Sequence, residues 1–175
     1  MTEEKEINKN INKDLYKSLL LEENIYIKPS DLNKKIDDII LLKLKKNIEG
    51  KCVKYGYVMQ NSIEIKKRSL GIINNASFDG NTIYKINYTA NVCNPTINQI
   101  IQCKVGHINK SQVICYIDIS EQSPIEIYLF KHNHVGNNEF LELKDNDIIN
   151  IKVGISNFKY KDKQIVCIGE FLSKN

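Results

Sequence analysis

The chain has 175 residues, of which 42% are hydrophobic and 26% are charged, and its formal net charge is +4. This length fits one ordinary domain or two small ones, and the apolar content is sufficient for a packed core. No apolar run approaches the roughly 18 residues that a membrane helix needs, and the charged N-terminus lacks the apolar region of a secretory signal. We therefore expect an intracellular protein that uses no membrane.

Lysine carries nearly all of the positive charge, because Arg68 is the only arginine. Lysine ammonium groups suit phosphates, but they cannot form the bidentate fork with which arginine reads guanine. The composition therefore permits non-specific contact with a nucleic-acid backbone and argues against base-specific readout. Asn, Ile and Lys are all over-represented, which also fits coding bias in an AT-rich genome.

Residues 1–24 are polar, yet Ile7, Ile11, Leu15 and Leu19 recur every four residues. That spacing would place an apolar stripe on a helix, which would need an apolar surface to dock on. The asparagine-rich composition fits a disordered tail equally well. We treat 1–24 as an N-terminal extension that is either flexible or a partner-binding helix.

Residues 25–95 predict one helix beside a small antiparallel sheet. Ile25–Pro29 reads as a short strand ended by proline, and Ser30 is placed to cap a helix over 32–46. Strand patterns follow at 48–59, 62–65, 70–73 and 82–92, with a turn at Lys66–Arg68. The strand over 82–92 alternates, which predicts a buried face made of Tyr84, Ile86, Tyr88, Ala90 and Val92.

Five strand candidates follow Pro95, at 97–108, 113–119, 125–130, 148–155 and 165–171. Five short strands with a longer connection between the third and the fourth are typical of an OB-fold barrel. The predicted fold class is therefore α+β. A small helix-plus-antiparallel-sheet tip domain (25–95) is followed by an all-β OB-fold barrel (96–175).

The parity of the barrel strands predicts an aromatic and basic outer face. Val113, Cys115, Ile117 and Ile119 would point inward, and so would Ile125, Ile127 and Leu129. Aromatic rings beside lysines can stack single-stranded bases and hold their phosphates. The outer residues with this potential are Tyr116, Tyr128 and Phe130, near Lys104, Lys110 and Lys131. The alternative is that the first domain or a partner covers these rings.

The sequence nominates no catalytic, metal or cofactor site. It has no glycine-rich phosphate loop, nucleophile elbow or paired carboxylates. His107, His132 and His134 lack a ligand partner on another element, and we expect them to be loop histidines at the barrel rim. The five cysteines form no Cys-x-x-Cys motif and lie in alternating apolar segments, so we predict buried free thiols.

Two segments carry a family resemblance. The first is Glu49-Gly50 followed by Tyr55-Gly56-Tyr57, and the second has the spacing Gly80, Tyr84, Ile86, Tyr88, Ala90, Val92 and Pro95. With the opening strand, the helix and the barrel, their order resembles the stalk subunit of multisubunit DNA-directed RNA polymerases. This is the type of the seventh subunit of eukaryotic polymerase II and of its archaeal counterpart. The Asn, Ile and Lys bias and the divergent barrel turn fit a large DNA virus with its own polymerase or an AT-rich eukaryote. The resemblance covers about residues 25–172.

Two features depart from that family's pattern. The segment 1–24 lies ahead of the point where the family usually begins. The Phe-Gly-x-Phe turn of barrels of the ribosomal-protein-S-one type is replaced by Ser111, Gln112, Val113 and Ile114.

The resemblance implies a non-catalytic subunit without cofactors. Its tip domain would dock on the polymerase core near the clamp, it would pair with a small helical stalk partner, and its barrel would contact nascent RNA weakly and non-specifically. The docking residues would be Tyr55, Gly56, Tyr57, Lys66, Lys67 and Arg68. The RNA-binding residues would be Lys104, Lys110, Tyr116, Tyr128, Phe130, Lys131 and His132.

Two other functions fit the same sequence. One is a free OB-fold protein that binds RNA or single strands, as a translation factor does, and the other is a structural adaptor without nucleic-acid contact. For the stalk subunit, a viral chain would act in the virion or a cytoplasmic viral factory, and a cellular chain in the nucleus.

Overall fold

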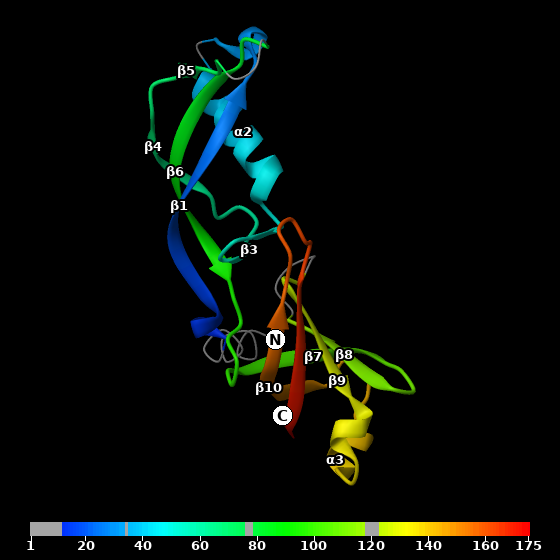
Figure 1. Cartoon of the computed structure of the whole chain (residues 1–175). Coiled ribbons are helices and arrows are strands. Elements are labelled where there is room, and N and C mark those ends of the chain that lie inside the picture. Colours follow the sequence, from blue (N-terminus) through cyan, green and yellow to red (C-terminus); the bar gives the residue numbers. More distant parts are fainter. Residues whose placement is uncertain (1–11, 34, 76–78, 118–122) are drawn as a thin grey trace. The chain divides into compact units, whose positions relative to one another are not determined.

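Figure 1 shows a computed structural model of the chain, in which strands dominate and helices are few. The structure describes residues 12–33, 35–75, 79–117 and 123–175. The chain divides into two compact units, which we call the barrel unit (1–17, 51–57 and 93–175) and the sheet unit (18–50 and 58–92). The predicted divisions after residues 24 and 95 stay predictions. No helix in the described ranges is long and apolar enough to cross a membrane.

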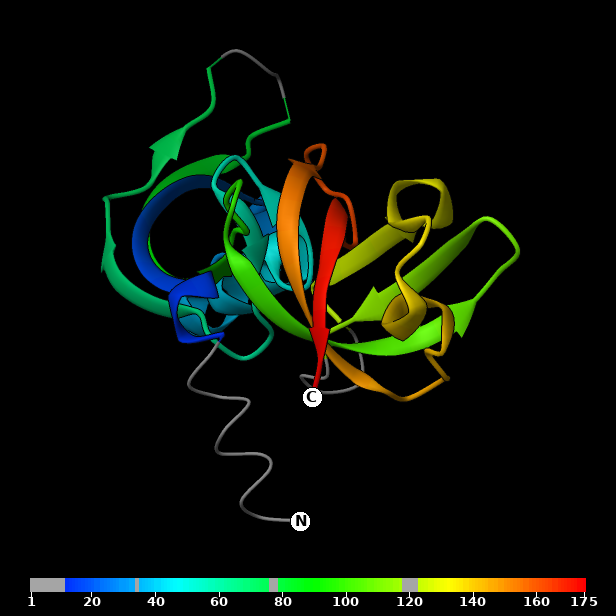
Figure 2. The same ribbon diagram turned by 90° about the horizontal axis from the view of Figure 1, so that it is seen from below.

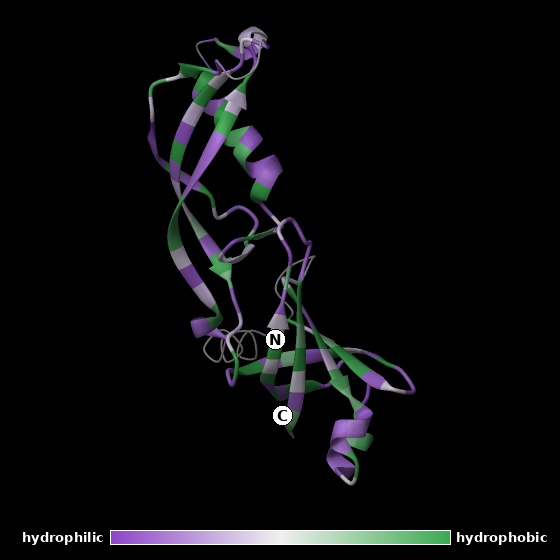
Figure 3. Cartoon of the chain, viewed as in Figure 1, coloured by the Kyte–Doolittle hydropathy of each residue, from purple (hydrophilic) through white to green (hydrophobic). Residues whose placement is uncertain are grey.

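The sheet unit is organised around β6 (Thr82–Cys93), the neighbour of β1 (Tyr16–Ile27). Two shorter strands pair antiparallel with β6, namely β4 (Glu64–Arg68) and β5 (Ile72–Ile73). Alternate β6 residues are buried. Figure 3 shows that hydrophilic and hydrophobic residues are interspersed along this strand. The buried set is the predicted one, so the face prediction is confirmed: Tyr84, Ile86, Tyr88, Ala90 and Val92.

The helix of this unit, α2 (Ile36–Ile48), begins four residues later than predicted. Pro29–Asp31 forms a 3-10 turn (η2), and the Ser30 hydroxyl donates to the Asp31 carboxylate at 3.2 Å, so the predicted cap is wrong. The helix buries Ile40, Leu44 and Ile48, which are spaced four residues apart along one face.

Two further predicted elements are corrected by strand pairing. The helix predicted within the extension is wrong for its described part, because Lys13–Leu15 is a 3-10 turn (η1) and β1 begins at Tyr16. Leu21, Ile25 and Ile27 are buried there on a strand pattern, so pairing with β6 prevails over the four-residue spacing. Ile7 and Ile11 lie outside the described residues. Lys66–Arg68 is part of β4, where Arg68 pairs with Ile86, and is not a turn.

The barrel unit contains a closed five-stranded barrel in the order β10-β11-β9-β8-β7. Its strands are β7 (Ile100–Ile108), β8 (Gln112–Tyr116), β9 (Ile125–Phe130), β10 (Ile148–Asn157) and β11 (Ile165–Lys174). The β9–β11 pair is parallel and the other pairs are antiparallel. Figures 1 and 2 both show β10 and β11 side by side. The closed barrel is consistent with the predicted OB-like architecture.

Alternating residues of the barrel strands fill its interior, as their parity predicted. Ile117, directly after β8, is buried, and so are the inward residues of β8 and β9: Val113, Cys115, Ile125, Ile127 and Leu129. Ile119 lies outside the described residues. All five cysteines are buried and free, which confirms the prediction for them: Cys52, Cys93, Cys103, Cys115 and Cys167.

The N-terminal segment is attached to this barrel through Asn12. Its amide donates to the Gln102 carbonyl at 3.0 Å, and its Oδ1 accepts the Gln102 N–H at 3.1 Å. Asn12 is buried, so the two hydrogen bonds are shielded from water.

A short hairpin lies in the barrel unit except for its last residue, Val58. Here β2 (Cys52–Val53) pairs antiparallel with β3 (Gly56–Val58), with Cys52 opposite Tyr57. The Cys52 N–H donates to the Asp162 carbonyl at 2.8 Å, and the Lys161 N–H donates to the Cys52 carbonyl at 2.8 Å. The β2–β3 hairpin and the turn between β10 and β11 are therefore joined through their backbones.

The connection between β9 and β10 carries a buried histidine. It consists of the 3-10 turn η3 (Lys131–His134) and the short helix α3 (Asn138–Leu141). The His134 Nε2 accepts the Phe171 N–H at 2.9 Å, so Nδ1 carries the proton and donates to the Phe130 carbonyl at 2.8 Å. The ring stacks on Phe140 with centroids 4.2 Å apart. His134 thus lies in a connection between barrel strands, as expected, but it is buried, and both of its ring nitrogens hold this connection to the barrel.

We expect His134→Ala to lower the free energy of unfolding by about 2–4 kcal/mol, because it leaves a cavity and two backbone groups without partners. The matched control is His132→Ala, since His132 is exposed two residues away. That change should stay within about 0.5 kcal/mol of the parent. Urea unfolding followed by circular dichroism measures both, and equal stability of the two variants would contradict the assigned role.

Candidate nucleic-acid interface

The strand register places the predicted RNA-binding residues in two separate groups. In the first group, Lys104 on β7 lies opposite Tyr116 on β8, and Tyr116 lies opposite Glu126 on β9. The next row along the strands pairs Ile114 with Tyr128. Tyr116 and Tyr128 are both partly exposed, and they lie on the outward side while their neighbours in sequence are buried. We call these residues the tyrosine rows.

The second group lies at the other end of β8 and β9. Phe130 lies opposite Gln112 at the start of β8, and its ring lies 5.5 Å from the ring of exposed His132. The Lys131 N–H donates to the carbonyl of Ser111, which follows Lys110 in the β7–β8 turn. The structure therefore brings Lys110, Phe130, Lys131 and His132 to one end of the barrel wall.

Glu126 is a residue of the tyrosine rows that sequence reasoning missed. Its Oε1 accepts the Tyr116 hydroxyl at 3.2 Å. Partial burial, followed by the Glu126 charge, raises the pKa of Tyr116 above its ordinary value, and burial with a hydrogen bond to Glu126 raises that of Tyr128. Both phenols stay protonated and neutral at ordinary pH, but the carboxylate between them would repel a nucleic-acid phosphate. The parity of β9 alone could have placed Glu126 on this outer face.

The Tyr116 ring also packs against the backbone of the neighbouring strand at Gly106. The β7–β8 register shifts between Val105 and His107, which leaves Gly106 as a bulge. A Cβ on Gly106 would overlap the ring of Tyr116, so the ring lies directly on the backbone there. One face of the ring is thereby occupied by the chain's own sheet, and Tyr128 is the freer tyrosine of the two for stacking.

The residues predicted to dock on a polymerase core differ in exposure. Tyr55 is 48% exposed, whereas Gly56 and Tyr57 are buried. On β4, Lys66 forms an ion pair with Glu64 at 2.6 Å, and Arg68 forms one with Asp37 at 2.7 Å. Lys67 between them is exposed.

Next to this basic strand lies an apolar group that the sequence did not single out. Leu70, Ile72 and Ile73 are 87%, 67% and 64% exposed. Ile72 and Ile73 form β5 at the start of β6. Three large exposed aliphatic residues in four positions are typical of a surface that a partner covers. Their apolar character was visible in the sequence, but a strand pattern alone gave no reason to expect exposure.

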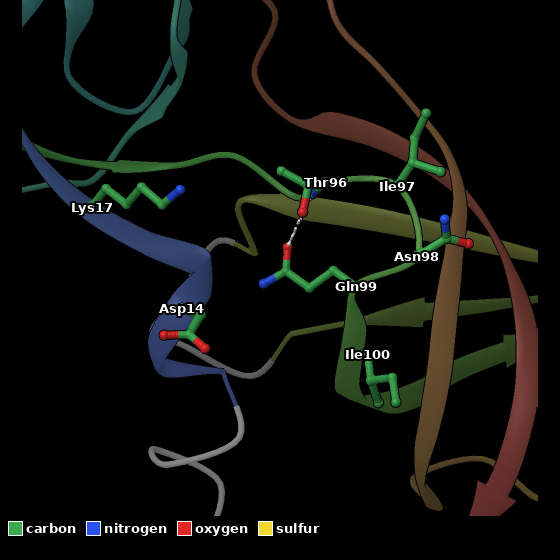
Figure 4. A pocket seen from close by; sticks show the side chains of 7 residues that line it. All are labelled: Asp14, Lys17, Thr96, Ile97, Asn98, Gln99 and Ile100. Carbon is green, nitrogen blue, oxygen red and sulfur yellow. Dashed lines mark hydrogen bonds between the residues drawn. The ribbon is translucent and has the colours of Figure 1, made fainter.

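A depression of about 640 Å³ lies in the barrel unit between the start of β1 and the segment before β7. Figure 4 shows that its wall carries one acid and one base, Asp14 and Lys17, and a Thr96–Gln99 hydrogen bond. The opposed charges give it no preference for a charged ligand. Within the described residues no group of three or more His, Cys, Asp or Glu side chains could hold a metal ion.

The chain is similar to a protein of Acanthamoeba polyphaga mimivirus named "Putative DNA-directed RNA polymerase subunit". The two are 26% identical over 172 aligned residues, which cover 90% of this chain and 82% of the relative. No protein-family model matches the chain. Because 90% of the chain is aligned, the likeness extends over residues of both compact units.

Proposed function

We propose that this protein is a non-catalytic subunit of a DNA-directed RNA polymerase, of the stalk type. The observation that carries the proposal is the likeness to the mimivirus protein over 90% of the chain. The closed five-stranded barrel supports it, since OB-type barrels commonly contact nucleic acid within larger assemblies. The viral relative also favours action in a viral factory or virion.

The sheet unit is the proposed docking element for the polymerase core. Its surface combines the apolar residues Leu70, Ile72 and Ile73 with exposed Lys67. Burial of aliphatic side chains supplies binding energy, and a neighbouring basic strand favours an acidic partner surface. A small helical subunit remains the proposed second partner.

The barrel unit is the proposed contact for nascent RNA. Tyr128 supplies a stacking surface, and Phe130 with Lys110, Lys131 and His132 supplies another at the end of β9. The Glu126 carboxylate between the two tyrosines repels phosphate, so we expect weak binding of RNA. We expect this binding to be sensitive to salt, because contacts between lysines and phosphates supply the attraction.

The direct test is affinity purification of the tagged full-length chain from its native source, followed by mass spectrometry. Recovery of the large polymerase subunits is the expected result. Recovery of ribosomal components without polymerase would instead support a free RNA-binding protein of the translation-factor type.

The double change Ile72→Asp with Ile73→Asp should reduce recovery of polymerase core subunits at least tenfold, because it places two charges in a desolvated contact. Ile97→Asp is the matched control, since Ile97 is 66% exposed and lies in the barrel unit. Both variants should fold, because the altered side chains are exposed. Equal recovery by the double variant and the control would rule out docking through β5.

Glu126→Gln should strengthen binding of single-stranded RNA about two- to fivefold at low salt, because a like charge about 4 Å away costs roughly 1 kcal/mol in water. The glutamine keeps an acceptor for the Tyr116 hydroxyl, so the strands should not shift. The control is Glu142→Gln, an exposed glutamate elsewhere in the barrel unit. Fluorescence anisotropy at two salt concentrations measures the effect, and an unchanged affinity would argue against RNA at the tyrosine rows.

A further inference from the structure

The two joined turns of the barrel unit each present an exposed tyrosine. Tyr55 lies in the β2–β3 turn and is 48% exposed, and Tyr160 lies in the β10–β11 turn and is 59% exposed. Neither ring contributes to the core of the protein. The two backbone hydrogen bonds between Cys52 and residues 161 and 162 hold these turns together.

A lysine lies over each of these rings. The Lys54 ammonium is 5.6 Å from the centroid of the Tyr55 ring, and the Lys161 ammonium is 5.5 Å from that of Tyr160. A cation within about 6 Å of an aromatic face is attracted by the ring. Both of these turns therefore have an exposed aromatic ring with a lysine ammonium beside it.

The β10–β11 turn is fixed by its own hydrogen bonds. The Asp162 carboxylate accepts the Lys159 N–H, and the Asp162 N–H donates to the Lys159 carbonyl at 3.1 Å. Lys161 has a positive φ of 71°. Because the turn is held in one shape, its ring and cations would lose little freedom on binding a ligand.

The surface has an excess of positive charge. Lys54, Lys159, Lys161 and Lys163 are all exposed, and within the described ranges none of them forms an ion pair. Asp162, the one acidic residue within the described turns 53–56 and 158–164, already accepts the Lys159 N–H through its carboxylate.

We propose that these two turns form a binding surface for single-stranded RNA, in which Tyr55 and Tyr160 stack bases and the four lysines contact phosphates. We call it the hairpin surface. Stacking on aromatic rings accepts any base, and lysines read no sequence, so the binding would be non-specific. This inference goes beyond the proposed function, because it gives Tyr55 a nucleic-acid ligand in place of a polymerase subunit and does not require assembly into a polymerase.

The test uses the full-length chain and a fluorescein-labelled oligouridine of about 16 nucleotides, with affinity measured by anisotropy. Tyr55→Ala with Tyr160→Ala should weaken binding at least tenfold, because stacking contributes about 1–3 kcal/mol per base. Tyr55→Phe with Tyr160→Phe should keep the affinity within about twofold, because the rings remain. Tyr26→Ala is the control, since Tyr26 is 52% exposed in the sheet unit.

A second measurement addresses the lysines. For single strands the slope of log affinity against log salt is about −0.7 per phosphate contact. The triple change of Lys54, Lys159 and Lys161 to Gln should therefore flatten the slope by about 2, whereas Lys28→Gln, an exposed lysine of the sheet unit, should leave it unchanged. An unchanged slope in the triple variant would overturn the proposal.

The remaining outcomes separate this surface from the tyrosine rows and from a protein ligand. A further variant, Tyr128→Ala with Phe130→Ala, removes the other predicted stacking rings. Unchanged RNA affinity in the Tyr55/Tyr160 alanine variant overturns the proposal, whether or not this further variant loses affinity. Loss of affinity only in the Tyr55/Tyr160 variant supports the hairpin surface and argues against RNA contact by Tyr128 and Phe130. Polymerase association is tested separately by affinity purification. Equal binding of polyglutamate, weakened equally by the same changes, would identify an acidic protein segment as the ligand and refute the RNA proposal.

Discussion

The parallel pairing of β9 with β11 is the constraint on which the barrel unit depends. Ile165 pairs with Ile125 and Ile168 with Tyr128, and this ladder closes five strands into a barrel. Closure fixes which side chains of β8 and β9 face the core and which face outward. The outward side chains include the tyrosine rows, so their spacing is set by the same pairing that buries Ile125 and Ile127. His134 holds the long β9–β10 connection to this barrel, because its two ring nitrogens form hydrogen bonds with the backbone of Phe130 and of Phe171.

Two surfaces of the barrel unit have aromatic rings beside lysines, and their electrostatics differ. At the tyrosine rows a carboxylate lies next to the rings, and one ring lies on the backbone at Gly106. At the hairpin surface each ring is accompanied by a cation, and the carboxylate of Asp162 takes part in the hydrogen bonds of its own turn. Composition cannot distinguish the two surfaces, because both are rich in Tyr and Lys. The position of one acidic side chain makes the difference.

The sequence predicted the strands of the barrel and their buried faces because a period of two residues is a direct consequence of the pleat. It failed where local and long-range preferences conflict. The spacing of Leu15 and Leu19 fits a helix, yet β6 offers the segment after Leu15 a pairing partner that lies more than fifty residues away in the chain. Ser30 has the composition of a helix cap, but its hydroxyl bonds to its neighbour Asp31.

In the candidate site, too, local patterns predicted the strand faces but not the long-range contacts. Parity placed Tyr116, Tyr128 and Phe130 on the outer face, but it said nothing of the partners that modify them. Burial of His134 depends on Phe140 and Phe171, which come from two other elements. The contact between Cys52 and the β10–β11 turn joins residues more than a hundred positions apart, and no local pattern signals it.

The same contact has a consequence for solubility. A strand at the end of a sheet leaves N–H and C=O groups that can pair with another copy of the chain. In β2 both backbone groups of Cys52 are already bonded to Lys161 and Asp162, so the strand offers no template at that residue. A shorter β10–β11 turn would uncover this edge. Loss of the turn should therefore appear first as aggregation of the native protein, before any loss of the barrel itself.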